Sequence, residues 1–192
     1  MPMPTLPLRV GCTAPPRGLT LVELLVTMAA EVILAMVAVP SMQSHFAARS
    51  TAGGADQLMQ ALRLARSESL KRLTPVTFCS TLQPDAVSPD CVGDWGSGWL
   101  VFVDTDRDAA VGGNDLVLKV GAVPASVGGL AEDGGARSVT FEASGLAGRA
   151  MAFTLTPAVS DRASTADTAN VQHVCLTVAG QIQIKKGSAL SC

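Results

Sequence analysis

The chain has 192 residues, of which 48% are hydrophobic and 16% are charged, and its formal net charge is −2. It is too apolar for an intrinsically disordered chain and too short for several large domains, so we expect one compact domain with an appendage. Only 4% of the residues are aromatic and two are histidines. This leaves little material for a base-stacking surface, a histidine metal centre or a coat of positive charge for nucleic acid.

The N-terminal part contains one apolar stretch of membrane-spanning length. The range Leu19 to Pro40 reads LTLVELLVTMAAEVILAMVAVP, and its charged residues are Glu23 and Glu31. As a helix it would extend roughly 33 Å, which matches a hydrocarbon core of about 30 Å. Arg9 and Arg17 precede it without any acidic residue. The positive flank predicts that the N-terminus stays in the cytoplasm and that the rest of the chain is exported.

The junction in front of this stretch suggests proteolytic processing. Gly18 follows Arg17, and Glu23 is the fifth residue after Gly18. A carboxylate inside hydrocarbon is costly unless it has a partner. Cleavage after Gly18 would free the α-amino group of Leu19, which could serve as the counter-charge for Glu23 of a neighbouring copy. The alternative is an ordinary single-pass anchor with an accidental acidic residue.

The segment GLTLVELLV resembles the class III signal of type IV pilins and secretion pseudopilins. In those families a prepilin peptidase cuts after the glycine and methylates the new N-terminus. The resemblance therefore implies a leader peptide at 1–18, cleavage between Gly18 and Leu19, and a transmembrane and stalk helix at 19–50. The sequence departs from the family at Leu19, where phenylalanine is usual.

A second helical segment is expected after the apolar stretch. Pro40 predicts a kink, because proline removes a helical hydrogen bond, and Gly53 and Gly54 predict an interruption. Residues 55–73 then have a period of 3.6, which is typical of an amphipathic helix lying on a sheet. The apolar face of this helix is predicted to carry Leu58, Leu62, Ala65, Ser69 and Leu73. Basic side chains on its other face are interpreted as solvated.

The chain after Pro75 consists of short β-rich runs separated by Gly, Asp and Pro. No helical segment is available to connect parallel strands, so we expect antiparallel pairing. The expected strands are 75–80, 98–104, 115–122, 138–143, 150–156, 171–178 and 181–185. The predicted fold class is α+β, with a long N-terminal helix packed on antiparallel β-sheets.

The sequence after the apolar stretch resembles one family more specifically. The segments LMQALRLARSESLKRLTPVTFC, DWGSGWLVFVDTDRD, SVTFEASGLAG and HVCLTVAGQIQIKKG are similar to those of GspH/FimT minor pilins and pseudopilins. The resemblance implies a periplasmic GspH/FimT-like domain at 51–192 that assembles into a filament with other pilins or pseudopilins. It also implies no catalysis and no cofactor.

Four cysteines remain after the predicted cleavage, and an even number in an exported domain favours disulfides. Of the three possible connectivities we favour the one that closes two local loops. It pairs Cys79 with Cys91 and Cys175 with Cys192. Each loop corresponds to about 3 kcal/mol in the chain-entropy model. A zinc site is the alternative, but the spacings lack the usual close pairs of ligands.

An acidic loop follows the second predicted strand. Carboxylates stand at positions 1, 3, 5 and 12 of a twelve-residue stretch, as they do in oxygen cages for calcium; they belong to Asp104, Asp106, Asp108 and Asp115. Position 6 is Ala109, where the sharp turn of such cages requires glycine. We therefore interpret this stretch as a solvated hairpin loop, with calcium binding as the alternative.

DNA is a further candidate partner because of the family resemblance. FimT-like members hold DNA during natural transformation with a basic Gly-Arg-x-Arg turn near the C-terminus. The corresponding turn is Gly180-Gln181-Ile182-Gln183, in which glutamines replace both arginines, with Lys185 and Lys186 close by. Glutamine cannot neutralise phosphate, so we expect weak, salt-sensitive binding at most.

These observations lead to one expectation and two alternatives. The chain is expected to be a minor pilin of a type IV pilus, stored in the inner membrane with a periplasmic C-terminal domain and then incorporated at or near the filament tip to prime assembly. The alternatives are a type II secretion pseudopilin of the same architecture and a DNA-binding minor pilin. Neither His45 nor His173 belongs to a pattern typical of catalysis, so no enzymatic activity is expected.

Overall fold

The computed structural model describes residues 18, 20–158, 170–187 and 192, and within the helix it describes only the backbone of residues 37–44. The predicted leader up to residue 17 and Leu19 therefore lie outside the described residues. The chain divides into two compact units, Met1–Pro40 and Ser41–Cys192.

Helix α1 covers Leu21–Arg72 and contributes to both units. In the first unit its apolar side chains are exposed, among them Leu21, Ile33 and Met36. Within the described residues, no helix combines the length and the apolarity that a membrane crossing requires. The two ends of the predicted span, Leu19 and the side chains of 37–40, lie outside that part of the chain.

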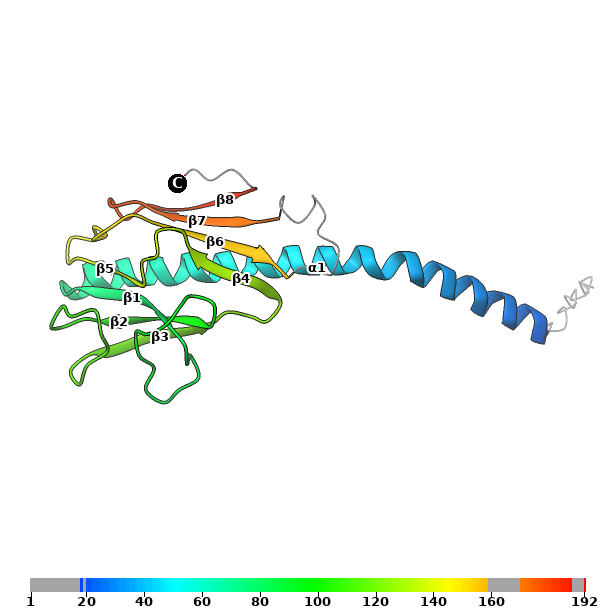
Figure 1. Ribbon diagram of the computed structural model, residues 1–192, viewed down its shortest axis with the longest axis horizontal. Helices are drawn as coiled ribbons and strands as arrows, with labels where there is room; N and C mark the ends of the chain where they lie inside the picture. Colours follow the sequence, from blue (N-terminus) through cyan, green and yellow to red (C-terminus); the bar gives the residue numbers. More distant parts are fainter. Residues whose placement is uncertain (1–17, 19, 159–169, 188–191) are drawn as a thin grey trace, which may run out of the picture. The chain divides into compact units, whose positions relative to one another are not determined.

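The second unit contains two antiparallel sheets. Their strands are β1 (Val76–Thr81), β2 (Gly98–Val103), β3 (Leu116–Ala122), β4 (Val127–Glu132), β5 (Ser138–Phe141), β6 (Met151–Pro157), β7 (Gln172–Leu176) and β8 (Ile182–Lys186). One sheet has the order β3-β2-β1-β5 and the other the order β4-β6-β7-β8, with antiparallel pairing throughout. Figure 1 shows β6, β7 and β8 on one side of α1 and β1, β2 and β3 on the other. The predicted α+β class, the antiparallel pairing and all seven expected strands are confirmed.

Strand β4 is an element that the sequence analysis missed. Its sequence VGGLAE contains Gly128 and Gly129, and glycine is rare in strands. The structure shows why glycine is required, since a Cβ on Gly128 would overlap the carbonyl group of Pro157 on the paired strand. The register of β4 against β6 also shifts between Val127 and Gly129. These residues allow close approach of the two backbones, a use of glycine that a hydrophobicity pattern does not reveal.

The helix packs closely against the second sheet where an interruption was predicted. Helix α1 continues through Gly53 and Gly54, so the predicted break is wrong. A Cβ on Gly54 would lie 3.2 Å from Leu155 Cδ2 and 3.3 Å from Val127 Cγ2. Gly54 therefore permits contact with the sheet, and this packing outweighs the low helix propensity of glycine.

The main core lies between α1 and both sheets. Its helical members include Leu58, Leu62 and Ala65, which confirms most of the predicted apolar face. The ring of Phe78 stacks on Trp95 at 5.2 Å between centroids, and Phe153 contacts both rings edge-on. Both tryptophans of the chain are buried and form part of this core.

The helix ends one residue earlier than predicted. Leu73 has φ of 53° and is 75% exposed, so its predicted place on the apolar face is wrong. This left-handed conformation is the common way to end a helix, although glycine usually occupies it. Leu73 therefore terminates α1 instead of packing beneath it.

Candidate functional site

The first turn of α1 contains Glu23, one of the residues implicated in processing. The backbone N–H of Glu23 donates to Thr20 Oγ1 at 3.2 Å, and Leu24 N donates to the carbonyl oxygen of Thr20 at 3.2 Å. Thr20 thus caps the helix, and Glu23 stands three residues later, as in a capping box. The partial positive charge of the helix N-terminus also favours a carboxylate in this first turn. The hydrogen bond of Glu23 in this cap is made by its backbone N–H, and the predicted role of its carboxylate stays a prediction. Gly18 precedes this cap and is exposed.

The first turns of α1 present an apolar surface that no described residue covers. Its most exposed large side chains are Leu21, Val22, Leu25, Val26, Met28, Ile33, Leu34 and Met36. A continuous apolar surface of this extent requires lipid or other protein chains around it. This surface is therefore a candidate for contact with lipid or with other chains.

The cysteines form the two disulfides that the sequence analysis favoured. Cys79 of β1 is bonded to Cys91, and Cys175 of β7 is bonded to Cys192. Each sheet therefore has one disulfide. Because all four sulfurs are used in this way, the alternative of a zinc site is wrong.

The acidic loop between β2 and β3 brings together three of its four predicted carboxylates. Asp104, Asp106 and Asp108 each offer an oxygen, and these oxygens lie within 4.8 Å of one another. Asp104 is fully buried, whereas Asp106 and Asp108 are exposed. Asp115 is not part of this cluster.

Asp115 instead holds the loop in shape. Its Oδ1 accepts a hydrogen bond from Thr105 N at 2.9 Å, and its Oδ2 accepts one from Gly112 N at 2.8 Å. Burial alone would raise the pKa of Asp115, but the hydrogen bonds from these two N–H groups outweigh it and place the pKa below its ordinary value. Asp115 is therefore ionised at neutral pH and acts as a brace between the two ends of the loop.

The glutamines of the predicted DNA-binding turn line a groove beside α1. The groove has a volume of about 510 Å³ and is lined by Arg63, Arg66, Ser67, Leu70, Gly180, Gln181, Ile182 and Gln183. Gln181 and Gln183 are exposed, and Lys185 and Lys186 lie outside the lining. The structure thus places two helix arginines beside the turn, a proximity that sequence reasoning missed because the residues are distant in the chain.

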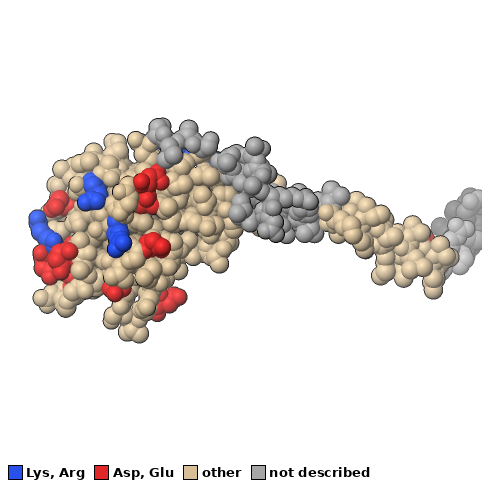
Figure 2. All heavy atoms as spheres, in the orientation of Figure 1, with Lys and Arg blue, Asp and Glu red and all other residues tan. Residues whose placement is uncertain are grey.

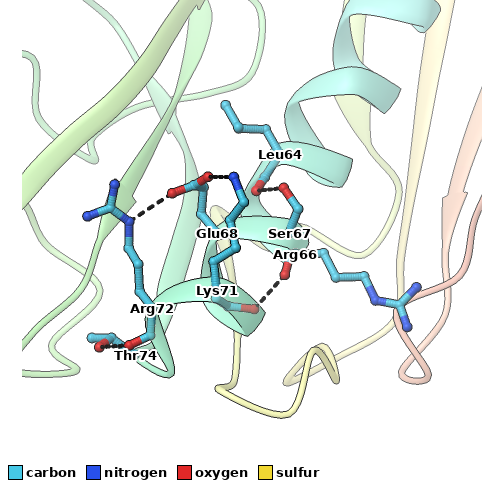
Figure 3. A network of polar contacts seen from close by, with 8 residues as sticks. Leu64, Arg66, Ser67, Glu68, Lys71, Arg72 and Thr74 are labelled. Atoms are coloured by element: carbon cyan, nitrogen blue, oxygen red, sulfur yellow. Dashed lines mark hydrogen bonds and ion pairs between the residues drawn. The ribbon is translucent and has the colours of Figure 1, made fainter.

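The side chain of Arg66 holds this turn in place. Its guanidinium group donates to the carbonyl oxygens of Gly145 at 3.1 Å, Gly180 at 2.8 Å and Ala179 at 3.3 Å. Figure 3 shows Arg66 pointing away from the side of the helix that carries Glu68, Lys71 and Arg72. The prediction of a wholly solvated basic face is wrong for Arg66, because backbone acceptors from two loops surround it.

The other basic residues near the end of α1 are paired with Glu68. Its Oε1 lies 3.0 Å from Lys71 Nζ, and its Oε2 lies 2.8 Å from Arg72 Nε. Hydrogen bonds from Arg72 and Lys71 lower the pKa of Glu68. On the face drawn in Figure 2, basic and acidic side chains of the second unit are interspersed. This mixed pattern does not favour a polyanion.

The two histidines occupy different environments. His45 is exposed on α1, and His173 is buried on β7. The ring of His173 hydrogen-bonds through Nδ1 to Thr154 Oγ1 at 3.0 Å and through Nε2 to the carbonyl oxygen of Gly187 at 2.8 Å. Both ring nitrogens have structural partners, so His173 joins strands.

Comparison with known proteins agrees with this architecture. The family model described as "Type II transport protein GspH" matches residues 54–180. No curated protein matches the chain. Two crystal structures of the type IV minor pilin FimU from Pseudomonas aeruginosa are similar in fold at 19% sequence identity. One has a TM-score of 0.52 and covers 73% of this chain and 92% of FimU, and the other has a TM-score of 0.50 and covers 71% and 94%. The chain therefore belongs to the GspH family and is a minor pilin or pseudopilin of the GspH/FimT type.

Proposed function

We propose that this chain is a minor pilin of a type IV pilus, a structural subunit that primes assembly at or near the filament tip. The observation that carries the proposal is the joining of a GspH-family domain to a helix whose N-terminal turns expose an apolar surface and an acid, Glu23. The fold shared with FimU supports it further. Pilin families are structural, and no catalytic step is part of the proposal.

The proposed pathway begins in the inner membrane, where the apolar turns of α1 are stored and the C-terminal domain faces the periplasm. A prepilin peptidase cleaves after Gly18 and methylates the amino group of Leu19. The apolar surface then moves from lipid into a filament core made by other pilins. There the carboxylate of Glu23 meets the freed amino group of an adjoining subunit, since an acid in an apolar environment needs a cationic partner.

The test separates the charge of Glu23 from its role in the helix cap. Glutamine at this position keeps the capping-box pattern but removes the charge, so Glu23→Gln is expected to abolish recovery of the subunit in sheared filaments while its level in membranes stays normal. Glu31→Gln makes the same chemical change two turns further along α1 and is expected to be incorporated as the wild type is. Immunoblots of filament and membrane fractions measure both.

Intact mass spectrometry of the native subunit tests the processing step. The proposal predicts a chain that begins at N-methylated Leu19 with all four remaining cysteines oxidised. A native polypeptide that retains its first eighteen residues would contradict it, and so would normal incorporation of Glu23→Gln.

A pseudopilin of a type II secretion system is the second candidate, favoured by the description of the matching family model. Deletion of the gene distinguishes the two. Loss of surface pili with normal protein secretion supports the pilus, and loss of secreted proteins with normal pili supports the secretion system.

DNA is not among the partners that we propose. The groove beside the predicted turn contains two arginines, but Arg66 is bound to three backbone carbonyls. Glutamines at 181 and 183 add no charge, and phosphate contacts depend on positive charge.

A further inference from the structure

The loop between β2 and β3 brings three carboxylates close together. The oxygens of Asp104, Asp106 and Asp108 lie within 4.8 Å of one another. Arg107 lies between them in the sequence, but its Nη1 pairs with Glu142 Oε2 at 3.6 Å. No ion pair found among the described residues involves any of the three aspartates. Carboxylates this close repel one another unless a positive charge is bound between them.

Asp104 supplies an independent observation. It is fully buried, and its Oδ2 accepts hydrogen bonds from Thr77 Oγ1 at 2.7 Å and from Ala109 N at 3.2 Å. Its Oδ1 is also buried but has no hydrogen-bond partner among the groups that the structure describes. Native proteins nearly always satisfy a buried carboxylate oxygen, through a donor, a water molecule or an ion. The orphaned oxygen belongs to a carboxylate that has an oxygen within 4.8 Å of those of Asp106 and Asp108, so a cation bound among the three would supply the missing partner.

The surroundings hold Asp104 in position for such a role. Thr77 of β1, which donates to Asp104 Oδ2, also hydrogen-bonds to Thr140 of β5 at 2.7 Å. The buried carboxylate is therefore held by a hydrogen-bond network that includes two strands. Asp115 braces the other end of the loop through Thr105 and Gly112. One carboxylate is therefore buried and held by hydrogen bonds, whereas Asp106 and Asp108 are exposed, and Asp108 Oδ1 accepts a hydrogen bond from Ala110 N at 2.8 Å.

We propose that Asp104, Asp106 and Asp108 form a binding site for one divalent cation, and that the cation is Ca²⁺. All available side-chain ligands are carboxylate oxygens, which are hard ligands that suit Ca²⁺ and Mg²⁺ rather than transition metals. Ca²⁺ accepts six to eight oxygens in irregular arrangements, whereas Mg²⁺ demands nearly ideal octahedral geometry. An irregular loop with one buried and two exposed carboxylates therefore favours Ca²⁺. Asp115 is a positioning residue in this site.

Calcium titration of the full chain in detergent micelles, after treatment with a chelator, tests the proposal. Isothermal titration calorimetry is expected to show one saturable site with a dissociation constant on the order of 10⁻⁴ to 10⁻³ M, the range of extracellular modules. MgCl₂ is expected to bind at least about tenfold more weakly. Calcium is also expected to raise the thermal unfolding midpoint of the second unit.

A pair of double variants locates the site. Asp106→Asn with Asp108→Asn is expected to weaken calcium binding at least about tenfold, because it removes the two exposed anionic ligands. Asp85→Asn with Asp90→Asn removes the same charge from exposed positions outside the loop and is expected to bind as the wild type does. Circular dichroism of each variant before titration establishes that it is folded. The buried Asp104 is left unchanged because its hydrogen bonds contribute to folding.

Three results would overturn the proposal. One is the absence of heat and of a thermal shift in wild-type protein up to about 10 mM CaCl₂, well above the expected dissociation constant. Another is equal loss of binding in both double variants, which would indicate a general effect of charge. The third is magnesium binding as tight as calcium binding, which would refute the choice of ion.

Discussion

His173 links three segments of the second sheet through one side chain. It lies on β7 and contacts Thr154 on β6 and the carbonyl of Gly187 just after β8. Thr154 Oγ1 in turn donates to Asp133 Oδ1 at 3.0 Å. Because His173 is only 5% exposed, water cannot readily replace its partners if the ring is removed.

Replacing this histidine should therefore cost stability. His173→Gln cannot reach both partners at once and is expected to lower the free energy of unfolding by about 1–3 kcal/mol, the usual penalty for buried polar groups left unpaired. His45→Gln is the matched control at an exposed position, where a change within about 0.5 kcal/mol is expected. Urea denaturation followed by circular dichroism measures both, and equal midpoints would refute the structural role.

At the scale of elements, two adjacent glycines of α1 have opposite environments. A Cβ on Gly53 would have no heavy atom within 4 Å, whereas one on Gly54 would press on Leu155 and Val127. Gly53 therefore affects stability only through the backbone entropy of the unfolded chain. Gly54 is needed for close packing between the helix and the sheet.

The two alanine substitutions should differ in their effect on stability. Gly53→Ala is expected to stabilise the second unit by up to about 1 kcal/mol, through helix propensity alone. Gly54→Ala gains the same propensity but must displace the side chains of β4 and β6, so we expect it to be neutral or destabilising. Thermal unfolding of both variants measures the difference. A more stable Gly54→Ala than Gly53→Ala would contradict the close contact.

The elements also show how far sequence reasoning extends. Strands such as β1 and β2 are continuous apolar or β-branched runs, and a local pattern is sufficient to predict them. Strand β4 and the continuity of α1 depend on contacts between glycines and distant residues, Pro157 and Leu155, which no local window contains.

The candidate functional site was also predictable only in part from the sequence. The spacing of Asp104, Asp106 and Asp108 can be read along the chain, and the structure brings these residues together. The burial of Asp104 and the brace formed by Asp115 arise from tertiary packing. The hydrogen bonds from Arg66 to the carbonyl oxygens of Gly145 and Gly180 join residues that are far apart in the chain. No local sequence pattern therefore predicted them.

On the scale of the whole folded unit, each sheet is cross-linked separately. The Cys79–Cys91 bond closes a loop of sequence separation 12 next to β1, and the Cys175–Cys192 bond closes one of 17 next to β7. The first bond also contributes to a small cluster with Leu100 and Phe102 on the outer face of the first sheet. Loop closures of this length restrict the unfolded chain substantially.

Removal of either disulfide should therefore be costly, and the two losses should add. Cys91→Ser and Cys192→Ser, which change the less buried member of each pair, are each expected to lower the free energy of unfolding by about 3 kcal/mol. The double variant should lose the sum to within about 0.5 kcal/mol, because the bonds lie in different sheets. Denaturant unfolding measures all three. A reducing agent should leave the double variant unchanged, and a further loss there would show that other thiol chemistry is involved.

The burial of helix residues in the domain core has a practical consequence for making fragments. Thr51 and Ala55 are fully buried, Ser50 Oγ lies 2.6 Å from Ser126 Oγ, and Thr51 Oγ1 donates to the carbonyl oxygen of Ala47 at 2.9 Å. A recombinant truncation intended for crystallisation should therefore start at or before Ala47. One trimmed to the borders of the recognisable family region would discard an anchor of its own hydrophobic interior.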